Sequence, residues 1–317
     1  MAPSHDGSQA PGRVAIAGAS GFIGRALSAH LAAAGWHVQP LVRRAPTPGR
    51  DEIRWMPAQG EVDAAALEGV DVVVNLAGEK LTAGRWTPAR RDALWSSRVH
   101  ATELLAEALT GLGEPPRLLI SASAVGYYGS RGDEVLTEDS PPGEGFLAGL
   151  CQAWEAATQP AARAGIRVVQ ARFGLVLGPG GGSLPLLARP FSLGVGAVLG
   201  DGGQYLSWVA LEDAVRALAH AMDHEALAGP VNVVAPAAVT NAELSRALGR
   251  VLRRPVLLRL PAPIVRLMFG EMGQEVLLAS TRVRPGRLLD SGFSFAQGEL
   301  EGALRQALAR PGRSAPA

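Results

Sequence analysis

A short glycine-rich segment near the N-terminus most constrains how this chain can fold. Residues 18–24 read GASGFIG, directly after the apolar run Val14 to Ala17 and at the start of a helical pattern, Phe22 to Ala34. In such a strand–turn–helix unit the first glycine permits a tight turn, the second lets the backbone approach a phosphate, and the third lets helix and strand pack closely. The helix N-terminus stabilises the anion. The segment therefore predicts a dinucleotide-binding turn.

The chain continues as alternating short apolar runs and helical patterns. The expected strands are Val14 to Ala17, Val38 to Val42, Val70 to Leu76, Leu118 to Ile120 and Ile166 to Ala171. The expected helices are Phe22 to Ala34, Thr87 to Thr110 and Phe146 to Ala164, followed by Gly35, Gly111 and Gly165, where we expect positive φ. The runs are almost continuously apolar, as expected for parallel strands covered on both faces. The pattern predicts an α/β fold with a Rossmann-type doubly wound parallel sheet.

The character of the sequence changes after Gly178-Pro179. A glycine-rich stretch follows, and then come a predicted helix at Leu211 to Ala221, a strand at Val231 to Val234, a helix capped by residues 240–243, and a further apolar helix at Ile264 to Met268. We expect a Rossmann domain at residues 13–178 and a smaller C-terminal α/β substrate lobe at 179–310, partly interleaved with it. Residues 1–12 and 311–317 are predicted to be disordered tails.

Composition and charge exclude several classes of function. Hydrophobic residues make up 47% of the chain and charged residues 19%, with a formal net charge of +1. This balance gives no reason to expect nucleic acid or a membrane as partner. The single cysteine, Cys151, excludes an internal disulfide, and the six histidines show no metal-ligand spacing, so no metal site is expected. Residues 1–13 lack the apolar core of a secretory signal, and we expect a cytoplasmic protein.

The end of the second predicted strand distinguishes between dinucleotides. An acidic residue there would bind the ribose 2′-hydroxyl of NAD, but the chain has Arg43 and Arg44. Two guanidinium groups suit the 2′-phosphate of NADP, which they can bind with charge-assisted hydrogen bonds, although both could also be ordinary surface arginines. The sequence therefore favours NADP(H) over NAD(H) as the cofactor.

Several motifs together resemble one protein family. They are residues 75–79 (NLAGE), 84–87 (GRWT), 97–99 (SRV), 123–129 (SAVGYYG), 154–155 (WE), 204–208 (QYLSW) and 270–272 (GEM). The pattern is similar to that of the extended short-chain dehydrogenases/reductases, and within them to the atypical "epimerase family" proteins, labelled NAD-dependent epimerase/dehydratase-like, which carry a C-terminal domain of unknown function. The resemblance covers about Arg13 to Leu308.

This resemblance implies a set of catalytic positions, most of which are altered here. The superfamily usually uses a Tyr-x-x-x-Lys pair, a serine at a strand end and often an asparagine on the long helix. Ser123 stands in the serine position, but Leu147 and Cys151 fall in the Tyr and Lys positions, and Arg98 in the asparagine position. Tyr127 and Tyr128 are the obvious replacement acids, or else aromatic wall residues.

The site residues predicted from the sequence fall into three groups. The catalytic candidates are Ser123, Tyr127 and Tyr128. The cofactor-binding candidates are Gly18, Ser20, Gly21, Phe22, Ile23, Gly24, Arg43, Arg44, Asn75, Ala77 and Gly78. The substrate candidates are Glu79, Arg85, Trp86, Arg98, Gln204 and Trp208. Two functions remain open: an oxidoreductase or epimerase acting on a small molecule, either a sugar nucleotide or another carbonyl compound, and an NADP(H)-binding regulatory protein without turnover.

Overall fold

The computed structural model describes residues 12–82 and 84–309. Its main sheet has eight strands in the order β13-β8-β6-β5-β1-β2-β3-β4. The strands are β1 (Arg13–Ala17), β2 (His37–Val42), β3 (Ile53–Met56), β4 (Glu61–Val62), β5 (Val72–Asn75), β6 (Leu118–Ala124), β8 (Arg167–Phe173) and β13 (Gly229–Val233). Every neighbouring pair is parallel except the hairpin β3–β4. The predicted doubly wound parallel sheet is thus confirmed.

The strand order reverses at β1, which defines where a ligand can enter. β1 pairs with β2 on one side and with β5 on the other, and Ala17 lies opposite both Leu41 and Asn75. In doubly wound sheets, ligands bind at the carboxyl ends of the strands where the order reverses in this way. Both the glycine-rich turn and the segment after Asn75 begin at this edge.

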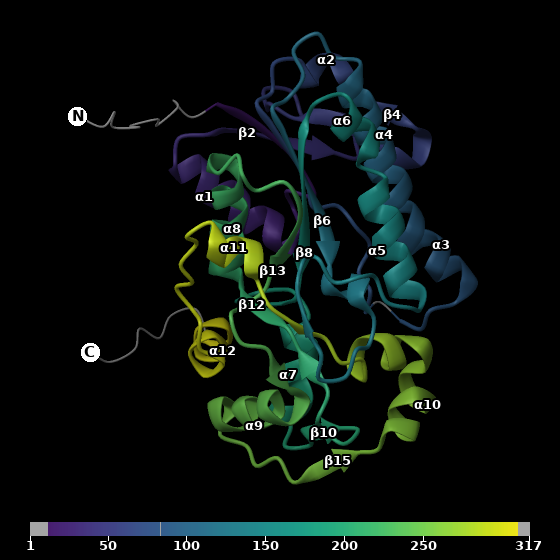
Figure 1. Ribbon diagram of the computed structural model, residues 1–317, viewed down its shortest axis with the longest axis vertical. Coiled ribbons are helices and arrows are strands. Elements are labelled where there is room, and N and C mark those ends of the chain that lie inside the picture. The colour runs from purple at the N-terminus through teal and green to yellow at the C-terminus, as the bar shows by residue number, and fades with distance from the viewer. Residues whose placement is uncertain (1–11, 83, 310–317) are drawn as a thin grey trace, which may run out of the picture.

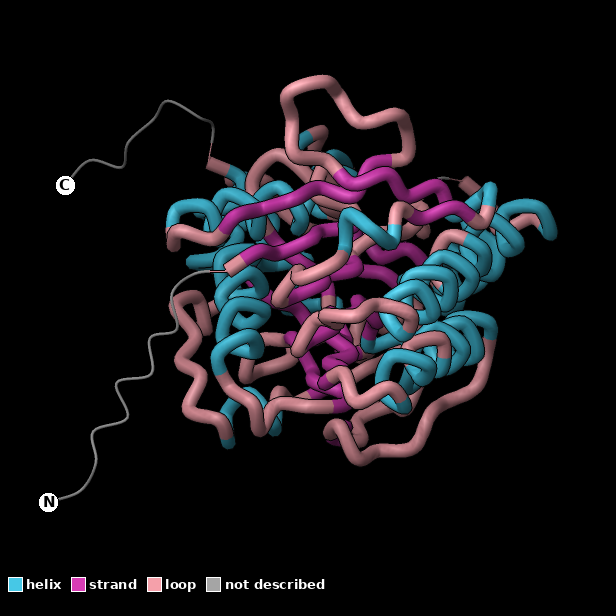
Figure 2. The backbone as a smooth tube through the Cα atoms, turned by 90° about the horizontal axis from the view of Figure 1, so that it is seen from above, coloured by secondary structure: helices cyan, strands magenta, loops and turns pink. Residues whose placement is uncertain are grey.

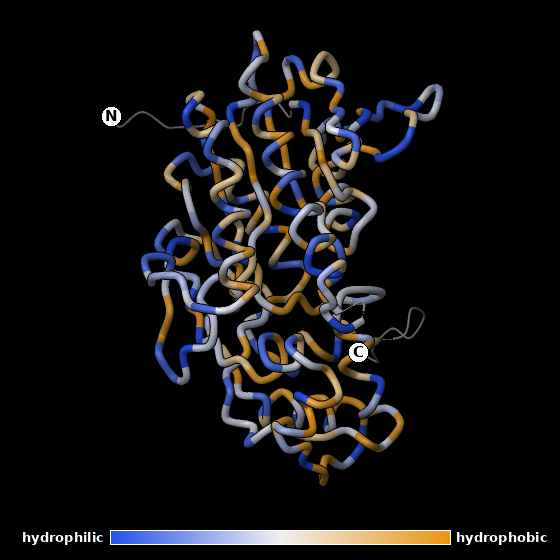
Figure 3. The backbone as a smooth tube through the Cα atoms, turned by 90° about the vertical axis from the view of Figure 1, so that its right-hand side faces the viewer, coloured by the Kyte–Doolittle hydropathy of each residue, from blue (hydrophilic) through white to orange (hydrophobic). Residues whose placement is uncertain are grey.

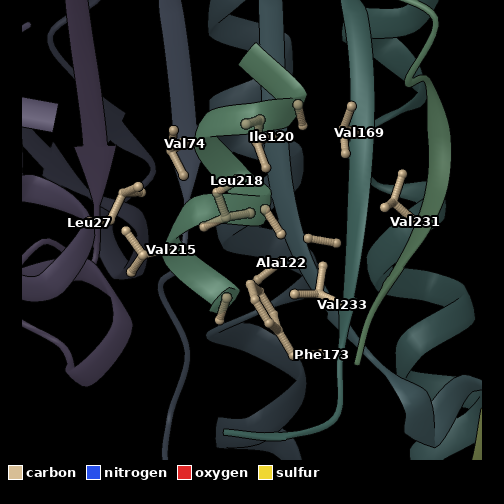
Figure 4. Packing of buried hydrophobic residues seen from close by; sticks show 14 of the residues in the cluster. Leu27, Val74, Ile120, Ala122, Val169, Phe173, Val215, Leu218, Val231 and Val233 are labelled. Carbon is tan, nitrogen blue, oxygen red and sulfur yellow. The ribbon is translucent and has the colours of Figure 1, made fainter. Parts of the chain in front are cut away.

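Helices cover both faces of the sheet (Figures 1 and 2). One face carries α1 (Phe22–Ala33), α8 (Leu211–Asp223) and α11 (Gly286–Asp290), and the other carries α2 (Ala64–Leu67), α3 (Pro88–Ser96), α4 (Val99–Thr110), α5 (Phe146–Ala156) and α6 (Gln159–Arg163). On the first face Leu27, Val215 and Leu218 pack against strand residues such as Val74 and Ile120 (Figure 4). Burial of these side chains on both faces explains why the strands are apolar throughout.

Two helices predicted as continuous are each broken in two. The pattern from Thr87 to Thr110 forms α3 and α4, with the break at Ser97 and Arg98. The pattern from Phe146 to Ala164 forms α5 and α6, because Pro160 has no amide hydrogen to continue the first helix and instead opens the second. Gly35 and Gly165 have the expected positive φ. Gly111 does not: its φ is −93°, and its amide bonds to the Ala108 carbonyl in a tightened last turn.

The region after residue 178 contributes to both parts of the molecule. β13 and α8 join the main sheet and its covering layer, so the predicted strand at Val231 to Val234 extends the sheet beside β8. The remaining elements form a smaller body at the lower end of Figure 1, around a separate core that includes Trp208, Leu244 and Leu304. They are β9 (Leu175–Leu177), α7 (Leu184–Ser192), β10 (Ala197–Leu199), β11 (Tyr205–Leu206), β12 (Trp208–Ala210), β14 (Val239–Thr240), α9 (Asn241–Leu252), β15 (Leu258–Leu260), α10 (Ala262–Met272) and α12 (Leu300–Leu308).

A short parallel pair, β7 (Val135–Leu136) with β16 (Arg282–Val283), connects the loop after β6 to the C-terminal segment. The cap predicted at residues 240–243 is present, since Thr240 and Glu243 form a reciprocal capping box. No helix in residues 12–82 and 84–309 is long and apolar enough to cross a membrane. The two predicted tails fall almost entirely outside the described residues.

Candidate cofactor and active site

The glycine-rich turn is closed by contacts that exclude a side chain. Gly18 has a φ of +78°, and a Cβ there would lie 2.8 Å from the carbonyl carbon of Leu76. A Cβ on Gly24 would lie 2.1 Å from the Gly18 carbonyl oxygen, to which the Gly21 amide donates at 2.8 Å. The loops after β1 and β5 therefore touch through backbone alone, which leaves a cradle of bare peptide groups.

The first turn of α1 keeps its amide groups available. Its N-cap residue, Gly21, supplies no capping side chain, and the first turn contains no acidic residue. Ser20 and Gly21 are exposed, while Phe22 and Ile23 are half-buried. Unpaired amides at a helix start are suited to bind an anion. The Phe22 ring packs on the segment after β9, where Cβ atoms at Gly181 and Gly182 would lie 2.4 and 2.8 Å from it.

Hydrogen bonds of the Asn75 side chain fix the loop after β5. This buried amide donates to Thr102 Oγ1 at 2.8 Å and accepts from the backbone N–H of Ala77 at 3.2 Å. Thr102 also accepts a hydrogen bond from the indole of Trp154. Asn75 therefore acts through the backbone, orienting Ala77 and Gly78 beside the glycine-rich turn.

Arg98 lies beneath this loop. A Cβ on Gly78 would lie 3.2 Å from the guanidinium carbon, so a side chain at residue 78 would displace Arg98. The guanidinium donates to the carbonyl oxygens of Glu79, at 2.8 Å, and Leu94, at 3.3 Å, and it lies 5.2 Å from the centroid of the Trp154 ring. Burial lowers the pKa of Arg98 below its ordinary value. Its donors are taken by neutral oxygens, so its positive charge is not balanced by a direct carboxylate bond.

The two arginines at the end of β2 have different surroundings. Arg44 donates to both carboxylate oxygens of Glu52, at 2.8 and 2.7 Å, and also to Thr47. The hydrogen bonds with Arg44 lower the pKa of Glu52 to about 2. Arg43 is exposed. No pattern in the sequence predicted this contact with Glu52. Because Glu52 binds Arg44, Arg43 is the more available of the two arginines for a ligand.

Ser123 belongs to a buried polar network. Its hydroxyl donates to Glu155 at 2.6 Å, and the same carboxylate accepts two hydrogen bonds from Arg172, both at 2.7 Å. Burial alone would lower the pKa of Arg172, but the bonds and charge of Glu155 raise it above the ordinary arginine value. The ion pair fixes the Ser123 hydroxyl, whose proton points to Glu155.

Tyr127 and Tyr128, both predicted as acids or aromatic wall residues, have different surroundings. Tyr128 is fully buried; its hydroxyl accepts from Arg172 at 2.9 Å and donates to Asn232 at 2.7 Å. Burial raises the pKa of Tyr128 to about 12. With its hydrogen bonds used internally, Tyr128 is a structural residue. Tyr127 is half-buried, and the Arg172 guanidinium stacks on its ring, 3.5 Å from the centroid.

The positions of the missing Tyr-x-x-x-Lys pair are filled by apolar groups. A Cβ on Gly126, just beyond the end of β6, would lie 3.4 Å from Leu147 Cβ and 3.8 Å from Cys151 Sγ. Both side chains therefore face the loop that carries Tyr127. Burial raises the pKa of the Cys151 thiol to about 12, so it stays protonated and cannot act as a nucleophile near neutral pH.

Four of the predicted substrate residues make contacts within the fold. Trp86 packs against Phe146 and donates to the Leu81 carbonyl, and Trp208 is buried in the smaller core. The buried Gln204 amide donates to the carbonyls of Leu199 and Leu277. The guanidinium of Arg85 donates to the Leu267 carbonyl and so ties its loop to α10. The partners in these contacts are distant in sequence, so the residue types alone do not predict them.

Glu79 and Arg98 lie at the loop after β5, where the Arg98 guanidinium donates to the Glu79 carbonyl. Glu79 pairs with Arg90 at 3.2 Å, and its side chain is 43% exposed. Glu275, which sequence reasoning missed, accepts from the amides of Phe146 and Leu147 and so caps α5. This capping carboxylate comes from a π-helical turn (Gly273–Leu277) far away in sequence, so no local signal predicts it.

Two open depressions elsewhere, of about 400 and 360 Å³, are lined mainly by α1, α8, α12 and residues 292–294. They contain none of the candidate residues. Among the residues that the structure describes, no cluster of three His, Cys, Asp or Glu side chains could hold a metal ion.

A parallel sheet with a glycine cradle at its switch point defines a Rossmann-type, dinucleotide-binding class of protein. The model of the NAD dependent epimerase/dehydratase family matches residues 14–235, and that of a domain of unknown function (DUF1731) matches residues 260–307. The chain belongs to this epimerase/dehydratase family and is of the extended short-chain dehydrogenase/reductase type.

Relatives match over nearly the whole chain. An epimerase family protein of Mycobacterium bovis is 49% identical over 94% of this chain and 98% of its own length. The human epimerase family protein SDR39U1 is 37% identical over 94% of this chain and 100% of its own length. A crystal structure of human SDR39U1 (isoform 2) with NADPH has a TM-score of 0.84 at 35% identity, covering 93% of this chain and 98% of that one.

Proposed function

We propose that this protein is an NADP(H)-dependent oxidoreductase or epimerase-type enzyme that acts on a small molecule without the usual Tyr-x-x-x-Lys pair. The observation that carries the proposal is the backbone cradle at the switch point, where Gly18 and Gly24 leave no room for a side chain. The uncapped first turn of α1 adds amide donors to it.

The residues present fit a dinucleotide. Gly18, Gly21 and Gly24, with the amides that open α1, would hold the pyrophosphate, and Ala77 and Gly78 would line the path beside it. Arg43 would bind the 2′-phosphate, with Arg44 available if it leaves Glu52. The NADPH in the human relative supports this choice of cofactor. When bound, NADP(H) supplies a hydride donor or acceptor.

Tyr127 is the group we assign to proton transfer with substrate. It stands beside the positions of the missing pair and is half-exposed, and the stacked Arg172 fixes its ring. Ser123 has a second role: because its proton is donated to Glu155, its oxygen lone pairs can accept a hydrogen bond from a substrate hydroxyl. Arg98, whose charge lacks a direct carboxylate bond, would favour a substrate or cofactor group with negative charge.

The substrate class that fits these groups is a small carbonyl compound, an alcohol or a sugar nucleotide. The single cysteine and its burial suit a reducing compartment, and we place the protein in the cytoplasm. These assignments rest on the residues beside the glycine-rich turn and at the end of β6.

Oxidation or reduction of the cofactor in the presence of a substrate tests the proposed enzyme activity. Purified protein is incubated with NADPH and a panel of aldehydes, ketones and keto-sugar nucleotides, or with NADP⁺ and the matching alcohols, while the absorbance of reduced cofactor is followed. We expect Tyr127→Phe to lower kcat by about 10²-fold or more, as for loss of an acid–base group. Tyr205→Phe, a matched change on β11 of the smaller body, should leave kcat unchanged. Full activity in Tyr127→Phe would refute the role of Tyr127.

A second candidate function is an NADP(H)-binding regulatory protein without turnover. Leu147 and Cys151 favour it, because apolar groups occupy both positions of the usual acid–base pair. Under this alternative NADPH binds but no member of the panel oxidises it, and Tyr127→Phe binds NADPH as tightly as the wild type does.

A further inference from the structure

The lower end of the molecule carries apolar side chains in solvent. Leu257 is 85% exposed, Leu258 52%, Ile264 42%, Leu267 75% and Met268 53%. We call these five residues the apolar tip. They come from β15, the residue before it, and α10, which lie together at the lower end in Figure 1, and Figure 3 shows hydrophobic segments at the same end. Contiguous exposed apolar groups mark an interaction surface.

The exposed apolar residues of α10 lie on one face of the helix. Ile264, Leu267 and Met268 stand at positions i, i+3 and i+4 and therefore share one face of the helix. Val265 is buried on another face of this helix, and Met272 is buried beyond a kink at Gly270. An ordinary surface helix has one apolar face toward the core and polar residues outside. Here the outward face is apolar too, so folding of this chain leaves it uncovered.

The stretch of sequence that carries the apolar tip, bounded by Glu243 and Glu271, is rich in arginine. Between residues 244 and 270 the sequence contains six arginines and no acidic residue, a local charge of +6 in a chain whose total is +1. All six are exposed: Arg246, Arg250, Arg253, Arg254, Arg259 and Arg266. Arg250 pairs with Glu301 of α12. The near-neutral total charge conceals this concentration, because acidic residues elsewhere balance it.

The positive charge indicates which kind of partner covers the apolar tip. A second copy of this chain, packed symmetrically on the same face, would bring two sets of arginines together, and like charges at an interface oppose association. A partner with dense negative charge and an apolar interior satisfies both features at once. An anionic lipid bilayer offers phosphate groups to the arginines and acyl chains to the leucines.

We propose that the apolar tip binds the surface of an anionic membrane. The five apolar side chains enter the boundary between headgroups and acyl chains, α10 lies along the surface, and the arginines contact lipid phosphates. The tip projects outward and lines neither of the two depressions, which suits a flat surface better than an inserted peptide. This association is peripheral, and it is independent of the function proposed for the cofactor site.

The experiment is flotation of the full-length protein with vesicles. One set is made of phosphatidylcholine mixed with phosphatidylglycerol and the other of phosphatidylcholine alone. We expect the wild type to float with the anionic vesicles only, and to be released by high salt, since screening weakens the charge contacts. Leu267→Gln/Met268→Gln and Arg253→Gln/Arg254→Gln should each weaken binding roughly tenfold or more.

Two matched variants serve as controls. Val135→Gln changes an apolar side chain that is 51% exposed on β7, and Arg163→Gln removes an exposed arginine on α6. Both should bind anionic vesicles like the wild type, and thermal unfolding should show that all four variants are folded. The proposal is overturned if the wild type does not float, if it floats equally with neutral vesicles, or if the controls lose binding as strongly as the tip variants. It is also overturned if light scattering shows a dimer that Leu267→Gln/Met268→Gln dissociates.

Discussion

At the scale of single residues, partners in the fold decide what a side chain can do. Arg43 and Arg44 are adjacent and chemically identical, yet Glu52 holds only Arg44 with two hydrogen bonds. The sequence predicted both arginines at the end of the second strand but not the acid, because Glu52 lies beyond a loop whose path no local pattern specifies. In the same way Tyr128 and Tyr127 are neighbours, and only the fold separates a sealed phenol from a half-exposed one.

Glu52→Gln tests the division between the two arginines. Removing this carboxylate releases Arg44 and takes a negative charge away from the site proposed for the 2′-phosphate. NADPH affinity should therefore rise by roughly two- to fivefold, the effect of one ion pair whose arginine is half-exposed, while NADH affinity stays the same. Calorimetric titration of both cofactors measures the change. Weaker NADPH binding would mean that Glu52 positions Arg44 for the phosphate instead.

Tyr128→Phe tests the buried network. Loss of the hydroxyl leaves the buried Oδ1 of Asn232 without its donor and removes one acceptor of Arg172, which keeps Glu155. It should cost about 1–3 kcal/mol in the free energy of unfolding, measured by urea denaturation. The wild-type contribution depends on pH. Because the pKa of Tyr128 is about 12 in the folded protein and about 10 in the unfolded chain, the folded state keeps a proton that the unfolded chain releases.

That contribution is fully present below pH 10 and is lost as pH rises through about 12. The difference in unfolding free energy between wild type and Tyr128→Phe should therefore shrink across this window. A difference that stays constant from pH 9 to pH 12 would show that the phenol titrates normally.

At the scale of elements, the sequence predicted what is repeated and local. The five predicted strands of the sheet and the helix after the glycine-rich turn are present. They could be predicted because a continuous apolar run and a glycine spacing are patterns contained within a few neighbouring residues. It missed the break before α4, where Arg98 bonds to the Glu79 carbonyl across a loop, and the cap of α5 by Glu275. Both depend on groups distant in sequence. The break at Pro160, by contrast, has a local cause and was open to prediction.

A pair of glycine variants tests the turn as an element. Gly24→Ala places a Cβ 2.1 Å from the Gly18 carbonyl oxygen, so the turn must distort. We expect a loss of about 1–3 kcal/mol in stability and of NADPH binding. Gly149→Ala is the control: it lies inside α5 with no heavy atom within 4 Å of the new Cβ, and should stabilise the protein by about 0.5–1 kcal/mol. Thermal unfolding and NADPH fluorescence measure both, and wild-type NADPH binding by Gly24→Ala would contradict the cradle.

At the scale of the whole molecule, the elements of the two bodies are interleaved along the sequence. β13 and α8 return to the main sheet and its covering layer after β9 and α7 have entered the smaller body, so each body is built from separate parts of the sequence. Contacts from Arg85 and Glu275 tie α10 and the turn after it to the loop after β5 and to α5. The alternation of apolar runs and helical patterns predicted the fold class, but total composition predicted the surface poorly, since a net charge of +1 gave no sign of the six arginines between residues 244 and 270.

Binding of NADPH by the purified full-length protein tests the central claim most directly. A fluorescence titration of wild type and Arg43→Glu with NADPH and with NADH compares the two cofactors in one experiment. The account predicts saturable NADPH binding by the wild type, and a loss of roughly tenfold or more for NADPH in Arg43→Glu with a much smaller change for NADH. Equal losses for both cofactors would contradict the 2′-phosphate assignment, and no binding of either cofactor by the wild type would contradict the proposed function itself.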